Sequence, residues 1–496
     1  MNSASSLNLR PPVHGNSETI LGPCLARARP WLCRIVPAAA VFCFLAWCYV
    51  SLRSDFSWDD AEPEILNTAW SLASGRSIYR SIDSPPFSFA AYPPLYYALV
   101  ALQLTFTGLS FLPAKLVSIL AALAIGWAMV RLNREWNAPA QDGKWAAFLL
   151  FLIPAFLYNA ARSHPQMMAV ALSIWSLVFF LHNRWLETAI ISPLLAVLAF
   201  YTKQTEVALP LAMVIYLALR NRRRLVAFIA TGAVAGLIPI FWLQNVTEGR
   251  FLLDTFRLAN LAYMVWQIPG IFIHHAGPIL LFIGLAMYIS WGRLREKRWE
   301  LIDLYLACVF LTTLVSLGRI GAHSQYVLEL LVVVLLYLLR TTGLPSMRGR
   351  DLLLSFQILF LLIYAPAFIF LEEGPGDMAR NRAAKQIYPL LKTGSGPILS
   401  QQASFALFSR GEVYVQLMHF TALSRAGLWN QEMLLREIDK ETFSWVITEF
   451  PIEESIRSDD DQERFTPEVL DALRRNYRRR QKIGPYYLYG PRPPGS

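Results

Sequence analysis

The sequence predicts an α-helical polytopic membrane protein, from its composition, its apolar segments and the position of its charges. Of its 496 residues, 55% are hydrophobic and 16% are charged, whereas soluble domains usually carry about 25% charged residues. Long, nearly uncharged segments recur from residue 34 to residue 371, and each could span about 30 Å of hydrocarbon as a helix. Most basic residues lie in short loops between them, so the net charge of +10 indicates membrane orientation rather than a nucleic-acid partner.

The N-terminal part predicts a tail and a first membrane span. Residues 1–30 are polar and rich in proline and serine, which is typical of a flexible segment, and we expect this tail in the cytoplasm. No clear cleavage site follows the apolar segment 34–52, so we expect a retained helix rather than a removable signal. This helix leaves the membrane on the outer side.

Four carboxylates follow the first span closely, namely Asp59, Asp60, Glu62 and Glu64. Acidic groups this dense beside a membrane are costly unless they bind a ligand or move a proton. An amphipathic helix is predicted at 62–74, and we expect Asp59 or Asp60 to cap it. Glu64, inside this helix, is expected to be solvated. Asp60 and Glu62 are therefore the candidates for a general base, with Asp59 as a further candidate.

The basic loops predict which segments cross the membrane. Four of these loops should be cytoplasmic by the positive-inside trend: 131–144, 220–224, 293–298 and 340–350. If the N-terminus is also cytoplasmic, an even number of crossings must precede Arg131. Spans at 34–52 and 113–131 satisfy this condition, so we expect the apolar segment 94–107 to be a helix in the membrane interface.

The remaining apolar segments predict about eleven crossings in total, with the C-terminus outside. The further expected spans are 145–160, 166–182, 187–202, 205–220, 225–243, 271–291, 301–317, 325–340 and 351–371. They complete a transmembrane domain at 31–371. Its first external loop, 53–112, contains the acidic residues and the two expected interfacial helices.

The C-terminal part changes in character. Residues 372–496 are charged, with strand-like runs at 397–400 and 443–448 and helical stretches at 431–439 and 467–478. A small extracytoplasmic α/β domain accounts for this pattern.

The predicted topology brings further polar residues to the side of the acidic loop: Arg162, His164, Lys203, Gln204 and His323. Cations at such a place can neutralise a phosphate leaving group from the lipid phase. Each residue also has a structural alternative. Arg162 and His164 could be interfacial anchors, Lys203 could extend from an apolar run towards water, and His323 could belong to a plain turn.

The sequence does not identify a metal site. His274 and His275 lack the partner spacing of metal ligands and are interpreted as structural. The carboxylates could hold Mg²⁺ or Mn²⁺, or act without a metal, so no cofactor is assigned.

Several motifs in this order resemble a known family. The carriers are 58–62 after the first helix, 72–79, Tyr92 to Tyr97, 200–205, and the Gly318 to Glu329 segment. Together they resemble bacterial members of the GT-C superfamily of integral-membrane glycosyltransferases, which includes aminoarabinose transferase and the protein O-mannosyltransferases. The resemblance implies a GT-C fold.

The resemblance also implies a reaction. A hexosyl or pentosyl group would move from a polyprenyl-phosphate carrier to a glycan, lipid or protein acceptor. Transfer would occur outside the bacterial cytoplasmic membrane, with inversion at the anomeric carbon. The family's catalytic aspartate falls on Asp60, and its phosphate-contacting lysine falls on Lys203. Glu62 is separated from Asp60 by Ala61, which leaves its role open. Tyr92 stands where aminoarabinose transferase has a lysine, and is a candidate for binding the donor.

Two other classes of function stay open at this point. A flippase or exporter of lipid-linked glycans would need charged residues inside the spans, for which Asp303 and Glu329 are the main candidates. A non-catalytic scaffold could instead present residues 372–496, but it would leave the acidic loop and Lys203 unexplained.

Overall fold

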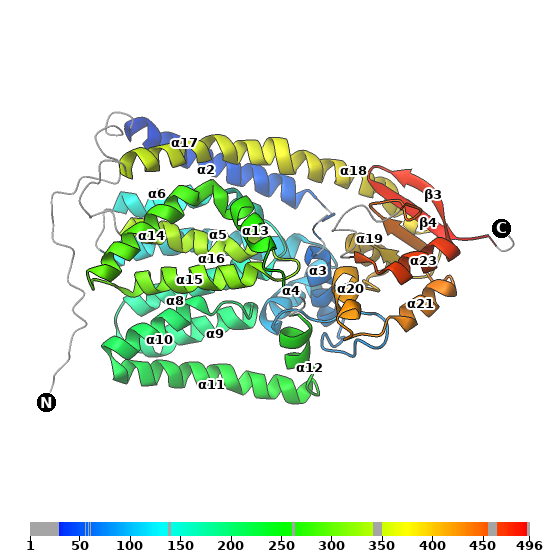
Figure 1. Ribbon diagram of the computed structural model, residues 1–496, viewed down its shortest axis with the longest axis horizontal. Coiled ribbons are helices and arrows are strands. Elements are labelled where there is room, and N and C mark those ends of the chain that lie inside the picture. The colour runs from blue at the N-terminus through cyan, green and yellow to red at the C-terminus, as the bar shows by residue number, and fades with distance from the viewer. Residues whose placement is uncertain are drawn as a thin grey trace.

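The computed structural model describes residues 29–54, 56–57, 59, 61–136, 140–259, 263–340, 350–454 and 464–493. Trp58 and Asp60 lie outside the described residues, as does nearly all of the N-terminal tail. Asp60 is the predicted catalytic base. Helices run side by side along the longest axis of the molecule, and a small sheet lies beyond one end of this bundle (Figure 1).

A helix is present at each position where the sequence predicts a membrane span. These helices are α2 (Arg29–Leu52), α5 (Leu112–Glu135), α6 (Ala140–Leu150), α7 (Pro154–Asn159), α8 (Pro165–Leu181), η1 (Glu187–Ile191), α9 (Ser192–Thr202), α10 (Ala208–Arg220), α11 (Arg222–Val246), α13 (Gln267–Ala276), η3 (Gly277–Ile279), α14 (Leu280–Arg295), α15 (Leu301–Leu317), η4 (Ser324–Val327), α16 (Leu328–Arg340) and α17 (Arg350–Ala367).

Five helical stretches within the described residues are long and apolar enough to cross a membrane. They are Arg34–Leu52, Leu112–Glu135, Arg222–Val246, Gln267–Arg295 and Leu353–Leu391. The other apolar helices are shorter, so the expected total of eleven crossings stays a prediction. The molecule is a multi-pass helical membrane protein.

One helix forms the centre of the bundle. α16 is buried along almost its whole length, including the side chain of Glu329. A helix that is apolar on all sides packs in an interior rather than at a surface. Large apolar side chains are instead exposed on peripheral helices, such as Phe241 and Trp242 on α11, as expected of surfaces that face lipid.

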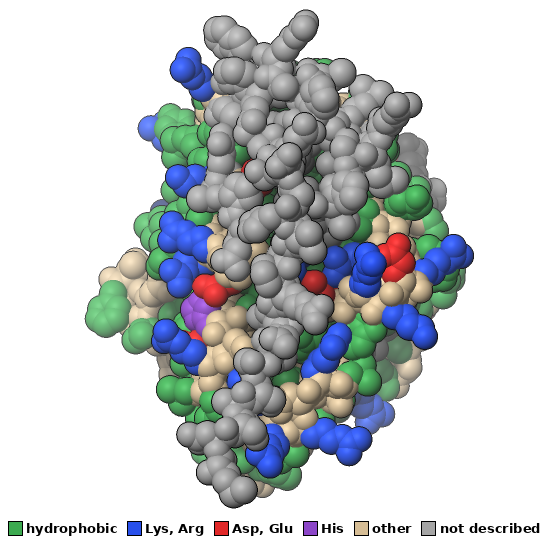
Figure 2. All heavy atoms as spheres, turned by 90° about the vertical axis from the view of Figure 1, so that its left-hand side faces the viewer, with side chains coloured by type: hydrophobic (Ala, Val, Ile, Leu, Met, Phe, Trp, Pro, Cys, Tyr) green, Lys and Arg blue, Asp and Glu red, His purple; other side chains and the backbone are tan. Residues whose placement is uncertain are grey.

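Basic side chains gather at the end of the bundle away from the sheet (Figure 2). Arg220 ends α10, Arg222 to Arg224 begin α11, and the end of α14 carries Arg293 and Arg295. This distribution agrees with the predicted cytoplasmic loops. The orientation in a membrane stays a prediction.

The first external loop contains both expected helices. α3 (Ala61–Ala73) confirms the amphipathic helix predicted at 62–74, and Gly75 ends it with a φ of 73°. The backbone N–H of Arg76 donates to the carbonyl of Ser71 at 2.9 Å, as in a helix end closed by a left-handed glycine. α4 (Pro94–Thr107) matches the predicted helix 94–107, while its place in the membrane interface stays a prediction.

The C-terminal part contains a four-stranded sheet in the order β1-β2-β4-β3. The strands are β1 (Ile398–Ser400), β2 (Trp445–Thr448), β3 (Tyr477–Ile483) and β4 (Tyr486–Pro491). β1 and β2 pair in parallel, and the other pairs are antiparallel. The accompanying helices are α19 (Ala403–Arg410), α20 (Leu417–Arg425), α21 (Glu432–Asp439) and α23 (Pro467–Asn476). β1, β2, α21 and α23 confirm the strands and helices predicted from the sequence.

A continuous helical stretch connects the bundle to this sheet. α17 passes through η5 (Phe368–Glu373) into α18 (Gly374–Leu391). The domain boundary expected after residue 371 falls inside this stretch, and the division into domains stays a prediction.

The C-terminal part also binds the first external loop directly. The backbone N–H of Phe87 donates to the carbonyl of Tyr414 at 2.7 Å, and the N–H of Gln416 donates back to the carbonyl of Phe87 at 3.0 Å. The indole of Trp429 donates to the carbonyl of Ile82 at 2.9 Å. The segments on either side of α20 therefore hold this loop against the C-terminal part.

Candidate active site

Asp59 joins the acidic loop to the segment before α8. One carboxylate oxygen accepts a hydrogen bond from the backbone N–H of Ala61 at 3.0 Å, which confirms a capping role at the start of α3. The other lies 2.9 Å from Nε2 of His164. Burial alone would raise the pKa of Asp59, but the charge of His164 and its hydrogen bond hold that pKa well below its usual value. Asp59 is therefore ionised at neutral pH.

Glu62 is occupied by protein partners. Its carboxylate accepts hydrogen bonds from the hydroxyl of Ser57 and the backbone N–H of Ser163, and lies 3.5 Å from the guanidinium of Arg162. The side chains of Glu62 and Arg162 are 0% and 1% exposed. This buried pair holds the start of α3 against the segment 162–164.

Arg162 is held by aromatic rings as well as by Glu62. Its guanidinium lies 4.6 Å from the ring centre of Tyr158 and 5.2 Å from that of Trp47. Cation–π contacts of this kind stabilise a desolvated cation.

The expectation that Glu64 is solvated is wrong. Its side chain is buried, and its carboxylate lies 3.1 Å from Nδ1 of His419 on α20. The C-terminal part packs over this face of α3, so a residue that looks exposed on the isolated helix becomes an interface contact. Nothing in the local sequence around Glu64 indicates a partner 355 residues away.

Lys203 lies in the turn after α9 and is only 1% exposed. Its ammonium lies 4.2 Å from the ring centre of Tyr326 and 5.6 Å from that of Tyr92. No hydrogen bond or ion pair joins this ammonium to another described residue. Burial lowers the pKa of Lys203, while the charge of Glu206 opposes that shift and Arg319 adds to it.

Tyr92 connects the lysine to the acidic loop. Burial raises the pKa of its hydroxyl well above the usual value; Tyr326, Asp59 and Glu64 act in the same direction, and Arg319 opposes them. The charges of the acidic loop and of Arg319 thus both act on Tyr92. The predicted residues Tyr92, Lys203 and Asp59 are therefore brought into one region.

Gln204 joins the segment before α4 to the short π-helix η2 (Leu253–Leu258). Its amide nitrogen donates to the carbonyls of Ala91 and Thr255, each at 3.0 Å. These bonds fix the backbone beside Lys203.

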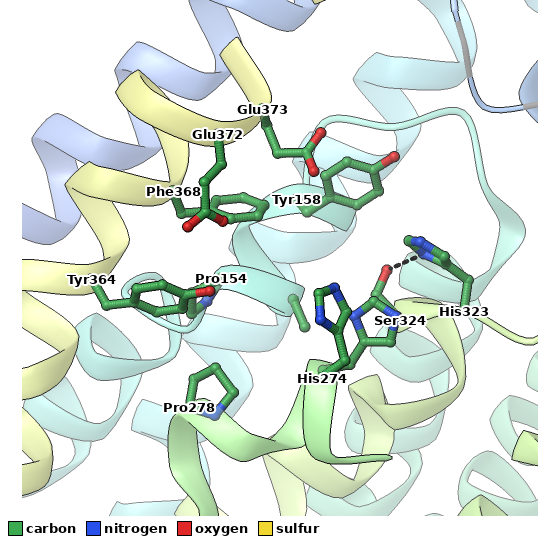
Figure 3. Close-up of a pocket in the computed structure, with 12 residues that line it drawn as sticks. Pro154, Tyr158, His274, Pro278, His323, Ser324, Tyr364, Phe368, Glu372 and Glu373 are labelled. Atoms are coloured by element: carbon green, nitrogen blue, oxygen red, sulfur yellow. Dashed lines mark hydrogen bonds between the residues drawn. The ribbon is translucent and has the colours of Figure 1, made fainter. Parts of the chain in front are cut away.

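His323 opens onto a cavity of about 100 Å³ (Figure 3). Its Nδ1 lies 3.0 Å from the hydroxyl of Ser324, and its ring centre is 4.5 Å from that of His275. His274 and His275 line the cavity too, with Tyr158 and Glu373 on other elements. The two histidines thus face a shared space, which their spacing in the sequence could not show. Within the described part of the chain, no group of three or more His, Cys, Asp or Glu side chains is arranged to hold a metal ion.

Sequence reasoning missed several charged groups around the site. Arg319 and Tyr326 lie in the Gly318 to Glu329 segment, which carries part of the family resemblance, but neither is among the predicted site residues. Glu206, one turn beyond Lys203, is buried. Arg464, from the C-terminal part, is close enough for the charge of Asp59 to raise its pKa against a larger lowering by burial. Of these, only Arg319 and Tyr326 carried a sequence signal.

Comparison with known proteins identifies the fold. A family model described as dolichyl-phosphate-mannose-protein mannosyltransferase matches residues 91–243. The structure of ArnT from Cupriavidus metallidurans bound to undecaprenyl phosphate has 13% sequence identity and a TM-score of 0.61, with 93% of this chain and 98% of that chain covered. The apo structure of the same protein has 15% identity and a TM-score of 0.58, again with 93% of this chain and 98% of that chain covered. No curated protein matches the sequence.

A more distant structural relative is the oligosaccharyltransferase of Archaeoglobus fulgidus tethered to an acceptor peptide. It has 11% identity and a TM-score of 0.54, covering 89% of this chain and 72% of that chain. Together, the family model and the shared fold confirm the predicted resemblance to the GT-C superfamily.

Proposed function

We propose that the chain transfers a hexosyl or pentosyl group from a polyprenyl-phosphate donor to an acceptor hydroxyl. Transfer would occur with inversion, on the extracytoplasmic side of a bacterial cytoplasmic membrane. The acceptor would be a glycan, a lipid or a protein. The ArnT structure with undecaprenyl phosphate, a polyprenyl phosphate, supports the donor class by analogy of fold.

The observation that carries this proposal is the environment of Lys203. A lysine ammonium that is buried without a close anion is unfavourable, because burial removes its hydration. The rings of Tyr92 and Tyr326 replace part of the hydration that the ammonium loses. A donor phosphate would supply the missing negative charge, and the ammonium would stabilise it as it leaves.

Asp60 is the proposed general base. Its carboxylate would take the proton of the acceptor hydroxyl as the oxygen attacks the anomeric carbon, and the bond between that carbon and the phosphate oxygen would break. The phosphate would leave with the bonding electrons.

Glu62 is assigned to positioning rather than to proton transfer. Its carboxylate is already engaged by Ser57, Ser163 and Arg162. A carboxylate in this state holds the loop in place but has little capacity to accept an acceptor's proton. Arg162 and His164 are proposed to hold the loop through Glu62 and Asp59. His323 lies at the neighbouring cavity, where a substrate group could be bound.

The rival transport function gains no support from Asp303, one of its two main candidates. Asp303 accepts hydrogen bonds from the hydroxyl of Tyr337 and the backbone N–H of Glu300, each at 2.7 Å, and lies 3.2 Å from Arg293. It therefore serves the start of α15, where it completes a capping box with Glu300.

The test is a direct assay of transfer. Purified protein in nanodiscs would be incubated with a panel of polyprenyl-phosphate sugars and candidate acceptors, and release of polyprenyl phosphate would be measured. Asp60→Asn is expected to lower the rate by at least about 100-fold, the scale of losing a general base. Wild-type turnover in this variant would overturn the assignment of Asp60.

A further inference from the structure

Glu206 is a second buried charge at the proposed donor-phosphate site. It lies three residues after Lys203 in the same turn, and its backbone N–H donates to the carbonyl of Lys203 at 3.1 Å. Its side chain is 3% exposed. A lysine and a glutamate buried in one turn would ordinarily form an ion pair, since each compensates the burial of the other.

The two side chains are instead kept apart. The carboxylate of Glu206 turns towards α8, where it accepts hydrogen bonds from the amide of Gln166 and, at 3.4 Å, from the hydroxyl of Ser173. No ion pair of 4.0 Å or less joins Lys203 to Glu206 or to another described residue. The charge of Glu206 nevertheless acts on Lys203 over the longer distance.

Other charged and titratable groups around Glu206 come from three more elements. The charge of Glu206 acts on Glu329 of α16, which accepts a hydrogen bond at 2.7 Å from the hydroxyl of Tyr305 on α15. Arg319, in the loop after α15, acts on Lys203 from another direction. Gln166 and Ser173 thus hold the carboxyl group of Glu206 near the lysine without a direct ion pair between the two side chains.

We propose that Glu206 selects between the donor and the spent carrier by charge, and so promotes release of polyprenyl phosphate after transfer. This inference rests on the proposed function. The donor is a phosphodiester with one negative charge, whereas free polyprenyl phosphate is a monoester whose second ionisation falls near pH 6. At neutral pH the product therefore carries up to one charge more than the donor.

A carboxylate held at a fixed place repels a phosphate dianion more strongly than it repels a phosphate monoanion. In a water-poor site a unit charge at several ångströms changes an affinity by about tenfold or more. Lys203 would attract both the diester and the monoester, and Glu206 would selectively weaken the binding of the monoester dianion. Direct pairing of Glu206 with Lys203 would abolish this selection, which gives Gln166 and Ser173 a positioning role.

The test uses two carriers that need no sugar. Farnesyl phosphate represents the monoester product, and farnesyl methyl phosphate is a diester that cannot ionise twice. Their Kd values for the full chain in nanodiscs would be measured at pH 5.5 and pH 8. In the wild-type protein, the preference for the diester should increase with pH. In Glu206→Gln, monoester binding at pH 8 should tighten by about tenfold, with a smaller change for the diester.

Two further variants separate the possible explanations. Glu329→Gln removes another buried carboxylate, whose hydrogen bond comes from Tyr305, and should leave the diester preference within about twofold of wild type. Lys203→Met should weaken both carriers. If it weakens neither, the proposed phosphate site is wrong. If Lys203→Met weakens both but Glu206→Gln leaves the diester preference and its pH dependence unchanged, the role of Glu206 is overturned.

Discussion

Replacing Lys203 by methionine removes a buried ammonium and keeps an unbranched side chain between Tyr92 and Tyr326. Methionine packs well against aromatic rings, so we expect the fold to be retained. The free protein should become more stable, because burial disfavours the charged lysine, as the lowered pKa of Lys203 indicates. A loss of stability would show that the lysine has an internal partner.

The lowered pKa of Lys203 also determines how the stability of the protein changes with pH. The pKa of Lys203 is lowered from its ordinary value of 10.5 to about 7 in the folded protein. Between these two pH values the unfolded chain holds a proton that the folded chain has lost. Stability therefore rises with pH across this window. Donor affinity should fall across the same window, since the neutral amine attracts a phosphate poorly. A stability that rises with pH and a donor affinity that falls with pH over the same range would together identify the titration of Lys203.

The size of the binding effect follows from the contact that is lost. A hydrogen bond to a charged group contributes about 1.5–3 kcal/mol, which corresponds to roughly 10- to 150-fold in affinity. The donor KM, or the Kd for farnesyl phosphate, should rise by this factor in Lys203→Met. Lys203→Arg should keep part of the affinity and lose the pH dependence, because arginine stays charged. Unchanged affinity in Lys203→Met, with a wild-type pH profile, would refute the reasoning.

Three further outcomes are expected. Glu62→Ala should lower the free energy of unfolding by about 3–5 kcal/mol, because it removes one partner of a buried ion pair with Arg162; lost transfer with unchanged stability in denaturation would instead assign Glu62 to the chemistry. A double-mutant cycle between Glu64 and His419 should give a coupling of about 0.5–3 kcal/mol, and additive effects would contradict their contact. The lowered pKa of Asp59 stabilises the fold above the ordinary carboxyl pKa, and this contribution is lost as pH falls. His164→Ala should therefore move acid unfolding to higher pH, and an unshifted acid transition would argue against the pair.

The sequence predicts local structure well where the periodicity lies within one element. α3 and α4 follow from apolar spacing, with Gly75 and Pro94 at their ends. β3 was missed because it begins Tyr-Arg-Arg-Arg and shows no apolar alternation. It forms because β4 supplies hydrogen-bonding partners on one side, and pairing across a tight turn is not visible in the composition of the strand itself.

The candidate site is predictable only where topology places residues on one side. Asp59, His164, Lys203 and Tyr92 follow from the order of the loops, since charge parity brings them to the same face. Glu64 does not follow, because its partner arrives from a part of the chain hundreds of residues away. Long-range covering of a surface depends on tertiary packing, which sequence periodicity does not encode.

The contrast between two buried cations separates positioning from binding at this site. Arg162 and Lys203 are equally buried, and each lies against two aromatic rings. Arg162 also has the carboxylate of Glu62, so its charge is compensated inside the protein. The nearest acid in the turn of Lys203 is held away by Gln166 and Ser173. A protein that only needed to bury a lysine would gain by releasing Glu206 to pair with it, and maintaining the separation costs stability. That cost is explained if the ammonium is reserved for an anion that must bind and then leave.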